Sequence, residues 1–229
     1  MVGSGYVLSD APPPLKIAWD QVAWRWAGQC SVAEAIAENL KDVKAVQGGA
    51  APRVFAFEPA APAVTLGRRA QTAEGRAALT STLARSLAHG WPNLDVDRGG
   101  LATLHLPGQI VVLVALPVAA IQLRSLVRHM LQAAAATATA RGCPTELRSD
   151  SDAGLWLGAG KLASIGLSHR AGVATHGLAL NVAIDCGYGG LFTLCGHTNA
   201  QLASLYPQGS HSPVLLSDVA QTLRAYLLR

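Results

Sequence analysis

Two side chains, Cys195 and Lys161, could carry nucleophilic chemistry in this chain. Cys195 precedes a glycine, and Lys161 lies between a glycine and an apolar stretch. A thiol beside a glycine at a strand end can be exposed, and glycine N–H groups near it can stabilise an oxyanion. If Lys161 lies near Cys195, its ammonium favours the thiolate and lowers the thiol pKa from its ordinary value of about 8.5. Residue type alone leaves two alternatives open: a buried, inert cysteine and a solvated lysine at a strand edge.

The segment 98–109 predicts a loop that can approach a ligand closely. It holds glycines at positions 99, 100 and 108 and leads into the apolar run 110–116. A glycine pair lets backbone N–H groups come near a bound molecule. Thr103 and His105 follow the pair, so we expect their polar groups to point into the same space.

Four blocks, taken in order, resemble the lipoyl(octanoyl) transferases, which move an octanoyl group from acyl carrier protein to a target lysine. They are 98–109, 160–166, 176–181 and 195–196, and the resemblance extends from about Glu58 to Leu205. It implies that Cys195 carries the acyl group as a thioester and that Lys161 stabilises the thiolate. It also implies a substrate pocket formed by Arg98, Gly99, Gly100, Leu101, Ala102, Thr103, Leu104, His105, Ser164, Ile165, Gly166, Gly177, Leu178 and Ala179. We expect His176 and Asn181 to hold the backbone of this pocket rather than to react.

The implied enzyme is an octanoyl-[acyl-carrier-protein]:protein N-octanoyltransferase, which acts in protein lipoylation and needs no cofactor. Its implied partners are octanoyl-loaded acyl carrier protein, the lipoyl domains of 2-oxoacid dehydrogenases and the glycine cleavage H protein. An ATP-dependent lipoate or biotin protein ligase on the same fold is the alternative enzyme, and a non-catalytic scaffold that binds carrier domains is the alternative of another class. We expect no metal, because the spacing of His176, Cys186, Cys195 and His197 matches no common zinc pattern.

The chain departs from the family's pattern at several positions. Leu194 stands where the family has proline before the cysteine, and Leu104 and Leu106 flank His105 where the family has tyrosine and glycine. We expect the two leucines to make the pocket wall more apolar. The early block keeps Glu58 and Thr65-Leu66-Gly67 but lacks the family's histidine and tyrosine. These departures bear on chain length and acceptor more than on the reaction type.

The hydrophobic pattern predicts an α/β (α+β) fold, and the resemblance implies a mixed β-sheet flanked by helices of the biotin/lipoate protein ligase catalytic-domain type. Ser31 and Glu34 have the spacing of a capping box, and Ile36, Leu40 and Val43 recur at helical intervals after them. The run 109–116 has no polar alternation and predicts a strand covered on both faces. Further helices are expected over 73–89, 118–141 and 217–228, the last capped by Ser217. Further strands are expected over 52–57, 63–66, 145–148, 154–157, 161–167 and 178–184.

Length and composition favour one domain over residues 16–229 after a flexible N-terminal segment, 1–15. The chain has 229 residues, half of them hydrophobic, and a formal net charge of +4 without a run of lysine or arginine, which argues against a nucleic-acid partner. No signal peptide is recognisable, and the apolar run 110–121, broken by Pro117, is too short to cross a membrane. We therefore expect a soluble, cytoplasmic protein without a membrane partner, and free thiols at its four cysteines.

Overall fold

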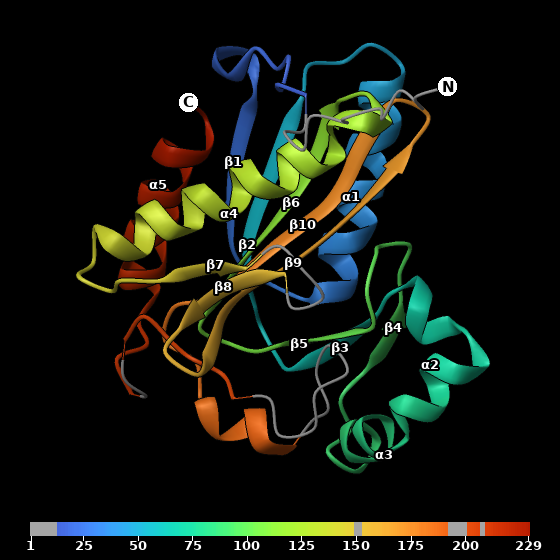
Figure 1. The fold of residues 1–229 in the computed structure, drawn as a ribbon, viewed down its shortest axis with the longest axis vertical. Helices are drawn as coiled ribbons and strands as arrows, with labels where there is room; N and C mark the ends of the chain where they lie inside the picture. The colour runs from blue at the N-terminus through green and yellow to red at the C-terminus, as the bar shows by residue number, and fades with distance from the viewer. Residues whose placement is uncertain (1–12, 149–152, 192–200, 207–208) are drawn as a thin grey trace, which may run out of the picture.

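A seven-stranded mixed sheet forms the centre of the fold in the computed structural model, which describes residues 13–148, 153–191, 201–206 and 209–229 (Figure 1). In spatial order its strands are β1 (Ala23–Cys30), β2 (Arg53–Pro59), β6 (Gln109–Pro117), β10 (Val173–Asn181), β9 (Gly160–Arg170), β8 (Gly154–Leu157) and β7 (Glu146–Arg148). The pair β1/β2 is parallel, and the other neighbours in this sheet are antiparallel.

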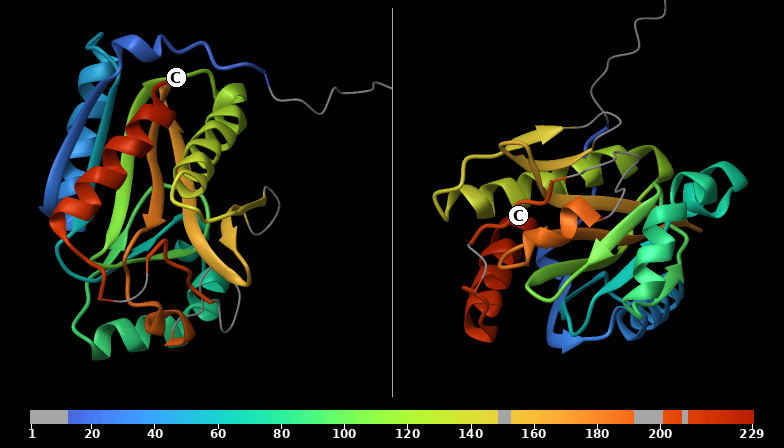
Figure 2. Two further views of the ribbon diagram at one scale, coloured as in Figure 1. Left: turned by 90° about the vertical axis from the view of Figure 1, so that its left-hand side faces the viewer. Right: turned by 90° about the horizontal axis from the view of Figure 1, so that it is seen from below.

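Strand β6 is buried on both faces, as its unbroken apolar sequence predicts. Val111 and Leu113 pack in a cluster with helix α1 (Val32–Gln47), whereas Val112 and Val114 join the main core on the opposite face. Helices α4 (Leu123–Thr139) and α5 (Pro213–Leu227) cover that opposite face and lie side by side (Figure 2). Burial on two faces explains why this strand has no polar alternation.

A second, three-stranded sheet lies beyond one end of the large sheet (Figure 1). Its order is β4 (Asn93–Asp95), β3 (Ala63–Leu66) and β5 (Ala102–His105), with helices α2 (Ala73–Ala78) and α3 (Thr80–Ala88) beside it. Leu66, Leu79, Leu104 and Leu106 belong to the separate apolar cluster that this sheet forms. The small sheet therefore has its own core and meets the large sheet along the segment 96–105.

Several predicted elements need correction. The expected helix 73–89 is two helices, because Leu79 leaves the helical path at φ −105°, ψ 7° and is fully buried in the small sheet's cluster. The expected loop 98–109 contains strand β5, which pairs with β3. The C-terminal helix begins at Pro213 under a cap by Ser212, four residues before the predicted start, since proline suits the first helical turn.

The first strand was not predicted, and one helix and one strand have bounds other than those expected. Strand β1 alternates exposed and half-buried residues, and the half-buried Trp24 and Trp26 pack against the main core. The expected helix 118–141 starts only at Leu123, after a short 3₁₀ turn. The expected strand 178–184 lies instead at 173–181. No helix in the part of the chain that the structure describes is long and apolar enough to cross a bilayer.

The predicted capping box of α1 is confirmed and offers a test of local stability. The Ser31 hydroxyl accepts a hydrogen bond from the Glu34 amide at 3.2 Å, and the Glu34 carboxylate accepts one from the Ser31 amide at 3.3 Å. Ser31→Ala removes the first bond, so we expect the free energy of unfolding to fall by about 1 kcal/mol in urea titrations. Ser31→Thr keeps the acceptor and serves as the control; equal losses in both variants would contradict the capping role.

Candidate active site

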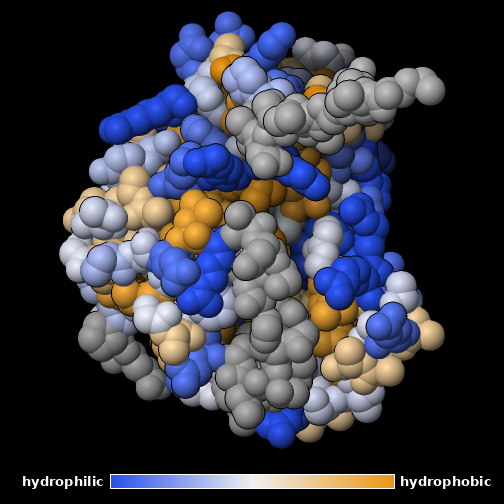
Figure 3. Space-filling view, in the orientation of Figure 1, coloured by the Kyte–Doolittle hydropathy of each residue, from blue (hydrophilic) through white to orange (hydrophobic). Residues whose placement is uncertain are grey.

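Two cavities lie on either side of strand β9. The first, the β10 cavity, encloses about 450 Å³ between α1, the large sheet and the small sheet. The second, the Lys161 cavity, encloses about 840 Å³ between the segment 98–103, β9 and helix α4. Arg98, Thr103, Ser164, Ile165 and Gly166 line both cavities, so the two spaces adjoin across these residues. Figure 3 shows apolar surface toward the middle of the face that carries α4, β8 and β9, with hydrophilic side chains around it.

The structure brings most of the predicted substrate-binding residues to these two cavities. Those on the β10 cavity are Arg98, Thr103, His105, Ser164, Ile165, Gly166, Gly177, Leu178 and Ala179. Gly99, Gly100, Leu101, Ala102 and the predicted catalytic residue Lys161 line the Lys161 cavity. Cys195 falls in the range 192–200, outside the described residues.

Leu104 has a different place from the one expected. Residues alternate along β5, so Thr103 and His105 face the β10 cavity while Leu104 points into the apolar cluster of the small sheet. Leu106 is 1% exposed and belongs to the same cluster. The two leucines therefore pack the small sheet and do not make the lining of either cavity more apolar.

Arg98 and Gly99 together join the two sheets. Its guanidinium donates hydrogen bonds to the Thr65 carbonyl at 2.8 Å, to the Thr65 hydroxyl at 3.0 Å and to the Gly99 carbonyl at 2.9 Å. The Gly99 amide donates to the carbonyl of Leu167 on β9 at 3.2 Å. The charged side chain is thus buried against backbone acceptors, which offset the cost of removing it from water.

Glycines at the facing positions of β9 and β10 keep this region open. Gly166 pairs with Gly177 across the two strands. A Cβ atom at Gly166 would lie 2.9 Å from the Cδ atom of Arg98, and one at Gly177 would lie 2.0 Å from the carbonyl oxygen of Val112. Neither position can accept a side chain without displacing its neighbour.

Two neutral histidines line the β10 cavity. Burial, with the positive charge of Arg98, lowers the pKa of His105 to about 3 and that of His176 to about 4. The Nε2 atom of His105 lies 3.1 Å from the Thr65 hydroxyl. At neutral pH the cavity therefore contains uncharged imidazoles, and Arg98 is the cationic group on its lining.

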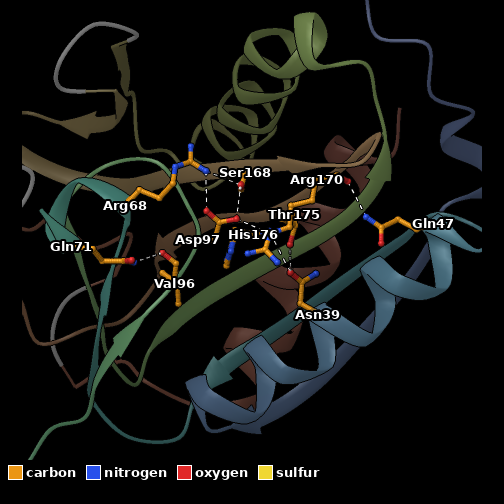
Figure 4. A network of polar contacts seen from close by, with 10 residues as sticks. All are labelled: Asn39, Gln47, Arg68, Gln71, Val96, Asp97, Ser168, Arg170, Thr175 and His176. Atoms are coloured by element: carbon orange, nitrogen blue, oxygen red, sulfur yellow. Dashed lines mark hydrogen bonds and ion pairs between the residues drawn. The ribbon is translucent and has the colours of Figure 1, made fainter.

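Asn39 and Asp97 are site-supporting residues that the sequence did not single out (Figure 4). Asn39 donates to the Val114 carbonyl at 2.9 Å and accepts from the Thr175 hydroxyl at 2.7 Å and the His176 amide at 3.3 Å. The expected apolar face of α1 is thereby corrected: Leu40 is 37% exposed, whereas Asn39 is buried. The sequence signal for this role was the spacing of Asn39, which lies four positions before the buried Val43 and therefore on the same face of the helix.

Asp97 joins the segment after β4 to the end of β9 (Figure 4). Its carboxylate accepts hydrogen bonds from Arg170 at 2.6 Å, Arg68 at 3.1 Å and Ser168 at 3.4 Å. Burial alone would raise the pKa of Asp97, but the bonds from Arg170 and Arg68 hold it below its ordinary value. This ion-pair cluster stands beside Val96 and Arg98, which line the β10 cavity.

Lys161 lies at the start of β9 and is 7% exposed. Its Nζ atom is 5.4 Å from the ring centre of Trp156, within the range of a cation–π interaction. Its amide donates to the Gln201 carbonyl at 2.9 Å, and its carbonyl accepts from the Ala203 amide at 3.0 Å. Both backbone groups of Lys161, its N–H and its carbonyl, are therefore hydrogen-bonded to the segment 201–203.

Comparison with known proteins gives consistent results for family and fold. Residues 30–221 match the model of the lipoyl protein ligase A/B catalytic domain. An octanoyltransferase of Nitratidesulfovibrio vulgaris (strain DP4) is 32% identical over 206 residues, 88% of this chain and 90% of that protein. One of Alkaliphilus metalliredigens (strain QYMF) is 28% identical over 191 residues, 80% of this chain and 86% of that protein.

A solved structure of lipoate-protein ligase A bound with ATP has the same fold. Its TM-score is 0.69 at 17% identity, over 89% of this chain and 81% of that one. The likeness confirms the predicted fold class, a mixed sheet flanked by helices of the lipoate ligase catalytic-domain type.

The buried histidines predict an acid-sensitive fold. In the unfolded chain a histidine takes up a proton near pH 6.5. In the folded state His105 and His176 stay neutral until the pH falls to their pKa values of about 3 and about 4, respectively. As pH falls below 6.5 the unfolded state binds more protons, so stability is full above that pH and is lost toward pH 4. Urea titrations from about pH 7.5 to about pH 4.5 measure this slope. His176→Gln should flatten it, and an unchanged slope in both His176→Gln and His105→Gln would contradict the assignment.

Proposed function

Because this chain belongs to the lipoyl protein ligase A/B catalytic domain family, and within it to the octanoyltransferases, we propose that it is an acyltransferase of protein lipoylation. It moves an octanoyl group from acyl carrier protein to a specific lysine of a lipoyl-dependent carrier protein. The acceptors are the lipoyl domains of 2-oxoacid dehydrogenases and the glycine cleavage H protein. Cys195 holds the octanoyl group between the two half-reactions.

The first half-reaction is thioester exchange. The Cys195 thiolate attacks the thioester carbonyl of the octanoyl carrier, and a bond from the Cys195 sulfur to the acyl carbon forms. The carrier thiolate leaves and takes up a proton from the Lys161 ammonium, which leaves Lys161 neutral. In the glycine-rich segment 98–100, the backbone N–H group of Gly100 is a candidate to stabilise the oxyanion, because Gly100 lines the Lys161 cavity.

The second half-reaction forms the amide. The neutral ε-amine of the acceptor lysine attacks the Cys195 thioester, the new C–N bond forms, and the Cys195 thiolate leaves. The amine loses one proton, for which a neutral Lys161 is the acceptor in the site. This transfer regenerates the Lys161 ammonium beside the Cys195 thiolate, which is the starting state.

The placement of Lys161 is the observation that carries this proposal. The side chain is buried, lines a cavity shared with the glycine-rich segment, and is bonded through its backbone to Gln201. Gln201 follows Cys195 by six residues, a chain length that spans at most about 22 Å. Cys195 is therefore tethered, over a short length of chain, to a segment that is bonded to Lys161, which supports a role for the Lys161 ammonium as partner of the thiolate.

The β10 cavity suits the octanoyl chain. Its lining includes Val32 and Ile36 of α1, Phe57 of β2, and Val111 and Leu113 of β6. This lining offers apolar contact to a saturated chain. Uncharged His105 and His176 avoid placing further charge beside the chain.

The other three thiols are less suited to the role of Cys195. Burial raises the pKa of Cys30 and of Cys186, with further contributions from Glu34 and Asp185 respectively. Cys143 follows helix α4, its thiol directed to the carbonyls of Arg141 and Leu205. A thiol with a raised pKa is mostly protonated at neutral pH and is a poor nucleophile.

The acyl-enzyme gives the direct test of the mechanism. Incubation with octanoyl acyl carrier protein, without ATP or magnesium, should place an octanoyl adduct on Cys195 and then form amide on a lipoyl domain. Cys195→Ala should abolish both products, whereas Cys30→Ala, Cys143→Ala and Cys186→Ala should keep them, as mass spectrometry of the digested protein will show.

Three results would contradict this mechanism. An adduct on Cys186, or full turnover by Cys195→Ala, removes Cys195 from the reaction. Equal activity with free octanoate plus ATP favours the ATP-dependent ligase. Specific binding of lipoyl domains without acyl transfer favours the scaffold.

If the Lys161 ammonium stabilises the Cys195 thiolate, the pKa of the Cys195 thiol is lowered. Lys161→Ala removes the positive charge, so we expect the pH midpoint of Cys195 alkylation to rise and acyl transfer at neutral pH to slow. Lys41→Ala is the matched control, because the side chain of Lys41 is 76% exposed on α1. Site-resolved alkylation by mass spectrometry measures the profile. An unchanged midpoint in Lys161→Ala would mean that the two residues are not neighbours.

A further inference from the structure

We propose that Asn181 is a positioning residue that fixes Lys161, and that Gln109 in turn holds the Asn181 side chain. This inference rests on the proposed function, because it assigns Asn181 an effect on acyl transfer through Lys161. Asn181 ends strand β10, and its side chain is 4% exposed. Asn181 does not line either cavity, so any influence on the reaction must pass through residues that it contacts.

Asn181 contacts three separate segments of the chain. Its side-chain amide donates to the Lys161 carbonyl at 3.1 Å, and its side-chain oxygen accepts from Gln109 at 2.9 Å. Its own carbonyl accepts from the Leu205 amide at 3.1 Å. One buried residue therefore joins the start of β9, the start of β6 and the segment that follows the thiol-bearing stretch.

Gln109 connects this junction to a tight turn. Its side-chain amide also donates to the Leu104 carbonyl at 3.1 Å, and its oxygen accepts from the Leu106 amide at 3.3 Å. These bonds need the amide nitrogen on the side of Leu104 and Asn181 and the oxygen on the side of Leu106, so they select one orientation of the Gln109 amide. That orientation fixes the Asn181 amide so that its N–H group faces Lys161.

Glu58 holds the same turn through the backbone of Gly108. Its buried carboxylate accepts from the Gly108 amide at 3.0 Å and is also bonded to His211. Gly108 has φ +86°, and a Cβ atom there would lie 2.4 Å from the Ala183 carbonyl oxygen. Only a glycine at position 108 allows the turn to lie this close to the chain after β10. The close packing leaves the neighbouring Gln109 little freedom to shift.

The Lys161 side chain has little room to compensate for a backbone shift. A Cβ atom at Gly154 would lie 2.6 Å from Lys161 Cε and 3.3 Å from Lys161 Nζ, so the lysine stem passes directly over this glycine. Trp156 presents its ring to the same ammonium group. With the stem confined in this way, a displacement of the Lys161 carbonyl moves Nζ as well.

The variant Asn181→Leu removes the side-chain hydrogen bonds to Lys161 and Gln109, yet each of these partners keeps another hydrogen bond. The Lys161 carbonyl keeps the Ala203 amide, and the Gln109 amide keeps the Leu104 carbonyl. Leucine has the same number and branching of side-chain heavy atoms as asparagine, although its methyl groups are bulkier, so we expect the variant to fold with a modest loss of stability. A catalytic effect can then be measured on folded protein.

The test is a double-mutant cycle between Asn181→Leu and Lys161→Ala. Asn181→Leu alone should lower kcat by roughly 10-fold to 100-fold with little change in KM, because a misplacement of about 1 Å has a cost of this order. It should also raise the pH midpoint of Cys195 alkylation. In the Lys161→Ala background it should change neither quantity further, since the residue through which it acts is gone.

Thr137→Val is the control for lost stability. This buried threonine on α4 bonds only its own helix in the described contacts, to the Ala133 carbonyl at 2.8 Å. We expect it to lower the unfolding midpoint while kcat and the alkylation profile stay unchanged.

The outcomes separate this inference from the proposed function. If Lys161→Ala changes neither kcat nor the alkylation midpoint, the role of Lys161 fails and the inference fails with it. If Lys161→Ala acts but Asn181→Leu does not, or if their effects on kcat multiply, Asn181 is only a structural residue and the inference alone is overturned.

Discussion

Arg98 and Gly99 together connect the small sheet to the large one, Arg98 through its bonds to Thr65 and Gly99 through the bond of its amide to Leu167. Both cavities lie along this joint. A guanidinium suits the position because it is planar and offers several donors in a fixed arrangement. Here those donors reach a carbonyl, a hydroxyl and the next peptide. A shorter or uncharged side chain would leave the Thr65 and Gly99 acceptors without this buried partner. The geometry of the candidate site thus depends on one buried cation being fully bonded.

The charges near this joint are arranged so that few of them face the β10 cavity. Asp97 is paired with Arg68 and Arg170 outside the cavity, while His105 and His176 are kept neutral within it. The polar groups of the β10 cavity thus serve mainly to hold strands in place. Lys161, the residue proposed to stabilise the thiolate, lines the other cavity.

Local patterns in the sequence predicted the parts of the fold that have local causes. The all-apolar run of β6, the strand 63–66, the strand 154–157 and the capping box at Ser31 were each recognisable from a few consecutive residues. Asn39 was not, because its partners Val114 and Thr175 are far away in the sequence. Leu79 breaks its helix for a similar reason: the cluster that buries it is formed by the small sheet. For the site, the order of the four family-like sequence blocks pointed to Lys161 and the segment 98–105. It could not predict on which face of β5 the Leu104 side chain would lie.

The facing glycines Gly166 and Gly177 have a consequence for how substrate range can change in this family. Backbone and Arg98 atoms already occupy the space into which a side chain at either position would extend. The sheet side of the β10 cavity is therefore a fixed boundary, which mutation cannot move by small steps. Val32 and Ile36 of α1 form the opposite boundary, where a change in side-chain size adds or removes lining volume directly. If the β10 cavity binds the acyl chain as proposed, divergence in chain length would accumulate on α1 rather than on β9 and β10.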